Sequence, residues 1–198
     1  YSSGIVIGGN DLEVYNNAFE VPNASSLDDI SQGIQTYTGA NNPTTGGIGG
    51  LWIHDNTFPD LGTGGWGYEG IYINSDVGDP TSTGLVVIDS NTFGGEIVRA
   101  ITSQRSNVEI TNNTIANDLA PSDLSVPGGW QGINVRSGSE QRNITLTGNA
   151  VGGSGPGLGF LEGVRVGQDK GQVMYSIIVT GNVYPGDNTT NLIRYDEA

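Results

Sequence analysis

The chain has 198 residues, of which 21 are acidic, seven are Lys or Arg and none is Cys. A net charge of −14 leaves no basic stripe that could neutralise phosphates, which argues against nucleic acid and against anionic membrane surfaces as partners. The absence of Cys excludes a disulfide framework and thiol chemistry, and no apolar stretch reaches the length of a membrane span.

An eight-residue pattern first appears at residues 12–19, Leu-Glu-Val-Tyr-Asn-Asn-Ala-Phe, and then returns along the whole chain. Its first, third and eighth positions are apolar, its fifth is a turn residue and its sixth is Asn. The later copies lie at 51–58, 86–93, 108–115, 144–151 and 177–184, with the repeated Asn at 17, 56, 91, 113, 149 and 182. Spacings of 39, 35, 22, 36 and 33 residues predict a solenoid.

Each position of the pattern has a structural reading. The apolar positions alternate, as they do in a strand with one buried and one wet face. The residue before each Asn is, except for Ser90, of a type that tolerates left-handed backbone, so the chain is expected to turn there. Stacked about 4.8 Å apart, the Asn side chains could form a hydrogen-bonded ladder. We favour this ladder over a row of ligand-binding amides, because it satisfies the buried polar groups of the turn.

A second, weaker repeat centred on Gly-Ile lies between the copies of the first. It occurs at residues 4–7, 33–36, 70–73, 100–103, 132–135, 163–166 and 192–195. Each coil therefore carries at least two strands, which predicts an all-β parallel β-helix of about six to seven coils, in one domain over residues 1–198. Neither end shows a cap, so we expect a segment of a longer secreted protein with covalent neighbours.

The combined pattern, G-I-x-V followed by V-x-I-x-x-N-x-F, resembles the repeat of the pectin-lyase-like superfamily from Gly4 to Tyr195. The resemblance implies a right-handed, single-stranded parallel β-helix. It does not select an activity, because that superfamily includes polysaccharide lyases, glycoside hydrolases, uronan epimerases, phage tailspikes and non-catalytic surface proteins. The G-H-G and R-I-K motifs of polygalacturonases and the D-P-H-E motif of uronan epimerases are absent from this sequence.

The residues just before each Gly-Ile suggest a binding face. They are Ser3, Gln32, Glu69, Arg99, Gln131, Glu162 and Asn191. Unpaired charges inside an apolar core would be too costly, so we expect the backbone to bend at the Gly and this column to face solvent. A bare Gly column beside it would leave a shallow groove, and the resemblance implies a substrate groove on such a face. The expected substrate-binding residues are Glu69, Tyr72, Asn134, Glu162, Trp66 and Trp130.

Candidate catalytic residues are few. A lyase of this fold would need a basic residue near the uronate, and Arg136 and Arg165, expected on adjacent coils, are the best pair; the alternative is that they pair with surface acids. Glu69 and Glu162 lie three coils apart, roughly 14 Å by stacking alone, which is too far for the two carboxylates of a glycosidase.

Two further features leave metal binding and acid–base chemistry open. Asp76 and Asp79, and also Asp118 and Asp123, offer the oxygen ligands that calcium prefers, although no twelve-residue calcium loop is present. His54, the single histidine, is expected to face outward below Asp89, where a surface polar ladder is favoured over catalysis.

The sequence thus predicts an extracellular or cell-surface module that contacts polysaccharide along the Gly-Ile face. The alternatives are a polysaccharide lyase, hydrolase or uronan epimerase, and a structural or adhesin segment whose stability depends on calcium.

Overall fold

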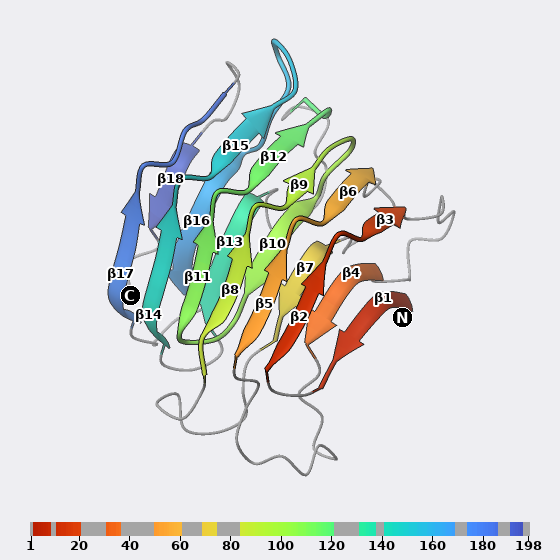
Figure 1. Cartoon of the computed structure of the whole chain (residues 1–198). Helices are drawn as coiled ribbons and strands as arrows, with labels where there is room; N and C mark the ends of the chain where they lie inside the picture. The colour runs from red at the N-terminus through yellow and green to blue at the C-terminus, as the bar shows by residue number, and fades with distance from the viewer. Residues whose placement is uncertain are drawn as a thin grey trace.

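The structure, a computed structural model, describes residues 2–8, 11–20, 31–36, 50–60, 69–74, 84–120, 131–137, 141–168, 174–185 and 191–195. The described chain is entirely β, and its strands stack into three parallel sheets (Figure 1). Trp66, Trp130, Asp76, Asp79 and Asp123 lie outside the described residues.

Sheet A holds the Gly-Ile strands, and each pairs in parallel with the equivalent strand of the next coil. Its order is β1 (Ser2–Ile7), β4 (Ser31–Thr36), β7 (Glu69–Ile73), β10 (Arg99–Ser103), β13 (Gln131–Ser137), β16 (Glu162–Gln168) and β18 (Asn191–Tyr195).

Sheets B and C hold the two halves of the Asn-containing pattern, before and after the Asn. Sheet B runs β2 (Leu12–Tyr15), β5 (Leu51–His54), β8 (Val86–Asp89), β11 (Val108–Thr111), β14 (Gln141–Thr147) and β17 (Met174–Thr180). Sheet C runs β3 (Ala18–Glu20), β6 (Thr57–Asp60), β9 (Thr92–Phe93), β12 (Thr114–Asn117) and β15 (Ala150–Gly153).

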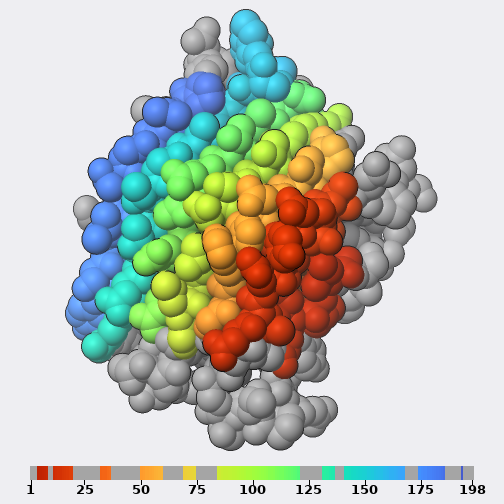
Figure 2. Space-filling view, in the orientation of Figure 1, coloured from red at the N-terminus to blue at the C-terminus, as the bar shows by residue number. Residues whose placement is uncertain are grey.

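The chain visits the sheets in the order A, B, C, so β1 to β15 make five complete coils. The sixth coil has β16 and β17 but only a single bridge, Ala150 to Val183, in place of a third strand, and β18 begins another coil. The number of complete three-stranded coils is therefore smaller than the expected six to seven. In Figure 1 sheet B rises in front, sheet A descends behind, and the chain advances from right to left, so the winding is right-handed. Figure 2 shows the coils as successive coloured bands across the face of sheet B.

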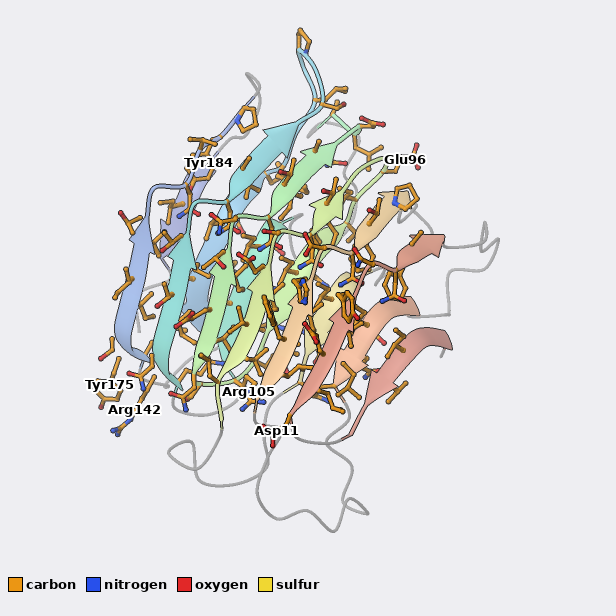
Figure 3. All side chains as sticks on the ribbon, in the orientation of Figure 1. Asp11, Glu96, Arg105, Arg142, Tyr175 and Tyr184 are labelled. Atoms are coloured by element: carbon orange, nitrogen blue, oxygen red, sulfur yellow. The ribbon has the colours of Figure 1, made fainter. Side chains whose placement is uncertain are left out.

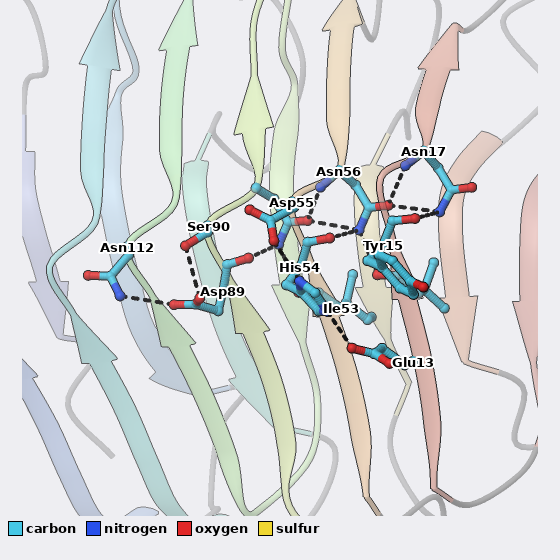
Figure 4. Close-up of polar contacts among 12 residues, drawn as sticks. Glu13, Tyr15, Asn17, Ile53, His54, Asp55, Asn56, Asp89, Ser90 and Asn112 are labelled. Atoms are coloured by element: carbon cyan, nitrogen blue, oxygen red, sulfur yellow. Dashed lines mark hydrogen bonds and ion pairs between the residues drawn. The ribbon is translucent and has the colours of Figure 1, made fainter.

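The predicted turn and ladder are confirmed. The residue before each repeated Asn has a left-handed backbone, with φ between 52° and 70°, and this includes Ser90. In the middle of the ladder, the Asn113 side-chain nitrogen donates to the carbonyl oxygens of Ile88 and Thr111 and to Oδ1 of Asn149. Its own Oδ1 accepts from both the backbone and the side-chain nitrogens of Asn91, 2.9 and 3.0 Å away. The first rungs, Asn17 to Asn56, are drawn in Figure 4.

The core is a narrow column of apolar side chains between the three sheets. Phe19, Phe58 and Phe93, the eighth residues of the first three copies, stack with ring centroids 4.8 and 4.5 Å apart. Ile115 and Val151 occupy the same position in the next two coils and are also buried. The apolar anchor of the sequence pattern is thus the inward residue of sheet C.

The Gly column of sheet A is where the aromatic rings of sheet C find room. A Cβ on Gly70 would lie 2.5 Å from Cε1 of Phe93 and 2.8 Å from the carbonyl oxygen of Ala100. A Cβ on Gly33 would meet Phe58 in the same way, at 2.6 Å. The expectation of an exposed groove along the Gly column is therefore wrong: the missing side chains leave space inside the core.

Candidate functional site

Sheet A is the basic sheet of an acidic protein. Its strands carry four of the seven basic residues of the chain, Arg99, Arg136, Arg165 and Arg194, and two acids, Glu69 and Glu162, which leaves two positive charges. The strands of sheet B carry three acids and one Arg, and those of sheet C carry two acids. With a net charge of −14 on the whole chain, this concentration marks the outer face of sheet A as the candidate site.

The column before the Gly residues is buried, which corrects the prediction that it faces solvent. Glu69 and Glu162 are each only 4% exposed, and Gln131 is fully buried. The carboxylate of Glu69 accepts a hydrogen bond of 2.9 Å from Thr102. This contact places the Glu69 side chain among the outward ones, as expected. The bend at the Gly was therefore predicted correctly, and the exposure was not.

Burial is tolerated because the column satisfies itself from coil to coil. Arg99 lies 3.5 Å from Glu69 through one guanidinium nitrogen and donates to Oε1 of Gln131 at 3.2 Å. Gln131 in turn donates to Glu162 at 2.9 Å, and Arg165 reaches Glu162 at 3.9 Å. Burying charges that are paired along the stack costs much less desolvation free energy than burying unpaired charges. The pairing joins residues of different repeats, so a single repeat did not predict it.

Burial and the neighbouring polar and charged groups act in opposite directions on the pKa values of this column. Burial raises the pKa of Glu69 above its ordinary value, although Arg99, Thr102, Arg136 and Gln32 act in the opposite direction. Burial likewise lowers the pKa of the Arg99 guanidinium, against the attraction of Glu69. Glu69 is thus a carboxyl group that takes up a proton more readily than one in water.

A second polar cluster lies further along the same face. With its amide oxygen toward Arg136, Gln104 accepts from Nε at 2.8 Å and from Nη2 at 3.1 Å, and its nitrogen donates to the Tyr72 hydroxyl at 3.0 Å. Burial and the charge of Glu69 raise the pKa of Tyr72, while Arg136 lowers it. Tyr72 and Arg136 are therefore brought together as neutral phenol and cation.

The two predicted catalytic arginines are on adjacent strands, as expected, but they are not opposite each other. Arg165 pairs in register with Asn134, and Arg136 pairs with Gly167. Arg165 leans back toward Glu162, whereas Arg136 joins Tyr72 and Gln104. They form two separate basic points on one face, with Asn134 beside Arg165.

Asn134 is the exception to this pattern of satisfied groups. It is 2% exposed, and its Oδ1 has no hydrogen-bond partner among the described residues. An unpaired buried acceptor costs on the order of 1–3 kcal/mol, so its presence calls for a reason.

His54 lies on the outer face of sheet B in register with Asp89, as expected, but it is buried (8% exposed), and its hydrogen bonds go to other residues. Its ring lies against those of Tyr15 and Trp52, with centroids 5.2 and 3.9 Å away. Its nitrogens contact Asp55 at 2.7 Å and Glu13 at 2.8 Å (Figure 4). Asp89 instead accepts from Thr111, Ser90 and Asn112.

One further charged contact on sheet B lies away from His54, at the end of the sheet. Arg142 lies over the ring of Tyr175 at 5.0 Å, and both lie at the start of their strands, at one end of the sheet (Figure 3). Within the described ranges, no three His, Asp or Glu side chains gather as a metal site would require. The expected calcium ligands Asp76 and Asp79 are outside those ranges, and Asp118 accepts a hydrogen bond from Ser154.

Arg99, Thr102 and Gln104 were not among the expected substrate-binding residues, although they belong to repeat columns of the same face. The signal was present for Arg99, which occupies the same repeat position as Glu69 and Glu162 in the coil between them. Gln104 follows the end of β10, at the repeat position that Arg136 occupies on β13.

Comparisons with protein-family models, with curated proteins and with solved structures gave no match. The part of the chain that the structure describes includes no helix of the length and apolar character needed to cross a membrane.

Proposed function

We propose that this chain is a module of an extracellular protein that binds a carboxylate-bearing polysaccharide along the outer face of sheet A. The observation that carries the proposal is the concentration of Arg on one sheet of a protein with a net charge of −14. A polyanion would be repelled by most of this surface and attracted by this face.

The residues of the face have suitable chemistry for a uronate chain. Arg165, whose side chain is 27% exposed, and Arg136 can each bind a carboxylate by paired N–H donors. Tyr72, partly exposed beside Arg136, offers a ring and a hydroxyl to a sugar. Strands stacked about 4.8 Å apart present these groups repeatedly along the axis, which suits an extended polymer.

A lyase is the second candidate, and one observation favours it. Arg136 acts electrostatically on Glu69, whose pKa is raised by burial, and Glu69 in turn raises the pKa of Tyr72; a carboxyl group with a raised pKa can serve as a general acid. Hydrolysis by two carboxylates is not supported, because Glu69 and Glu162 are three strands apart, about 14 Å by stacking.

A glycan array that includes neutral, sulfated and uronate polysaccharides tests the proposal. We expect retention of uronate chains above neutral ones, and retention that falls as salt rises. Preferential binding of neutral glycans would contradict it. Incubation of the hits with the protein, followed by a search for unsaturated uronate products, separates a lyase from a binding module.

A further inference from the structure

Arg136 differs from two other arginines of sheet A, Arg99 and Arg165, in the charge of the groups that it contacts. Arg99 lies 3.5 Å from the carboxylate of Glu69, and Arg165 lies 3.9 Å from that of Glu162. No carboxylate among the described residues forms an ion pair with Arg136, although Arg136 acts on Glu69 at longer range, more weakly than Arg99 does. Of these three cations, Arg136 therefore gains most from an added anion.

Gln104 holds the guanidinium of Arg136 from one side. Its amide oxygen accepts from Nε at 2.8 Å and from Nη2 at 3.1 Å, and its nitrogen donates to the Tyr72 hydroxyl at 3.0 Å. The backbone of Gln104 is fixed in turn, because its N–H donates to the carbonyl oxygen of Ile73 at 2.8 Å. A guanidinium has five N–H donors in a rigid plane, so the edge formed by Nη1 and Nη2 remains available to a second acceptor.

This cluster is in contact with solvent. Tyr72, Gln104 and Arg136 are each partly exposed, whereas Glu69 and Glu162 are only 4% exposed. An anionic group on the outer face can therefore approach Arg136 without first displacing an acid of the protein.

We propose that Arg136 is the main anchor for a carboxylate of the bound uronate chain, and that Gln104 is a positioning residue that aims Arg136 without neutralising it. The inference rests on the proposed function and adds to it which of the two exposed arginines, Arg136 or Arg165, contributes more. An acid in place of Gln104 would also hold the guanidinium, but it would cancel the charge that attracts the ligand. A neutral partner preserves that charge and reduces the conformational entropy that the Arg136 side chain loses on binding.

Two substitutions of Gln104 separate the effect of its charge from that of its hydrogen bonds. Gln104→Glu keeps the length and the acceptor and adds a negative charge, whereas Gln104→Met removes the hydrogen bonds and leaves Arg136 without a counter-charge. We expect Gln104→Glu to weaken binding of an oligouronate by at least about tenfold, and Gln104→Met by about two- to fivefold. If Gln104 served only to fix the geometry, the order would be the opposite, because Glu still holds Arg136 and Met does not.

A matched control separates the local charge from the net charge. Thr114 is exposed on sheet C, so Thr114→Glu makes the same change in net charge away from the proposed site. It should alter the affinity by less than about twofold in the same isothermal titrations. Melting curves show whether each variant is folded. The single variants Arg136→Ala and Arg165→Ala give an independent comparison, in which Arg136→Ala should lose more affinity.

Three results would overturn the inference while uronate binding stands. Gln104→Glu could bind as tightly as Gln104→Met or more tightly, Thr114→Glu could weaken binding as much as Gln104→Glu, or Arg165→Ala could lose as much affinity as Arg136→Ala or more. If the wild type does not bind the oligouronate, the proposed function and this inference fall together.

Discussion

At the scale of single residues, the repeated Asn and the Glu–Arg column solve the same problem, which is how to bury polar groups in a narrow solenoid. Asn113 makes three hydrogen bonds through its side-chain nitrogen and accepts two more through its oxygen. Glu69 is held by Thr102 and Arg99. In both cases the partner comes from a neighbouring coil, so each residue is satisfied only in the assembled stack.

Replacing Asn113 by Leu should destabilise the protein by about 3–5 kcal/mol, because several buried groups lose their partners at once. Thr111→Val, which removes the outward hydrogen bond to Asp89, should cost clearly less. Chemical denaturation of both variants checks this difference, and equal free energies of unfolding would refute the buried ladder.

His54 should give the stability a dependence on pH. Burial lowers the pKa of His54, and its contacts with Asp55 and Glu13 raise it by more, so the folded-state pKa lies above the ordinary 6.5. A raised pKa stabilises the fold fully below about 6.5, and that contribution is lost as pH rises through the folded-state value.

The free energy of unfolding of the wild type should therefore fall, relative to that of His54→Gln, as pH rises from below 6.5 to above the folded-state pKa. NMR titration of the imidazole provides the pKa directly. A titration midpoint at or below 6.5, with parallel pH profiles for the two proteins, would contradict the prediction.

At the scale of the elements, the sequence predicted sheets A and B, their parallel stacking and the turn between B and C. These follow from a pattern that repeats in every coil, so each copy supports the others. The third sheet was not predicted, because β9 has only two residues and β3 only three. The role of the Gly column was missed for a different reason: Gly70 and Phe93 are in contact but belong to different repeats of the sequence.

The fit between Gly and Phe predicts a coupled pair of substitutions. The fourth coil has Ala100 at the Gly position and Ile115 at the Phe position. Ile115→Phe alone should be destabilising by about 1–3 kcal/mol through overpacking against Ala100. Adding Ala100→Gly should recover part of that loss, and a double-mutant cycle measures the recovery. Additive effects of the two changes would show that the two positions do not share space.

The site was less predictable than the fold. The spacing of the Gly-Ile repeat predicted that the candidate residues share one sheet, and Glu69, Tyr72, Asn134, Arg136, Glu162 and Arg165 all lie on the sheet A strands. The burial of Glu69 and Glu162 could not be predicted from the sequence. It depends on polar and charged contacts between neighbouring coils, whose partners are about 30 residues apart in the chain. The same holds for Gln104, whose contact with Arg136 joins β13 to a residue that follows β10.

At the scale of the whole molecule, the charge is unevenly distributed over the three sheets. The strands of sheet A are net positive, those of sheets B and C are net negative, and the chain as a whole has a net charge of −14. In the proposed function, a polyanion would be repelled elsewhere and held on this face at short range, by contacts with the arginines.

Isothermal titration of an oligouronate into the wild type, Arg136→Ala/Arg165→Ala and Arg142→Ala tests the central claim most directly. Arg142 is the matched control, because it is an exposed Arg on sheet B, where its guanidinium lies over the ring of Tyr175. We predict binding by the wild type that weakens as salt rises, little change for Arg142→Ala, and a loss of at least about tenfold in affinity for the double variant. Affinity that survives the double substitution, or falls equally in Arg142→Ala, would contradict polysaccharide binding on sheet A.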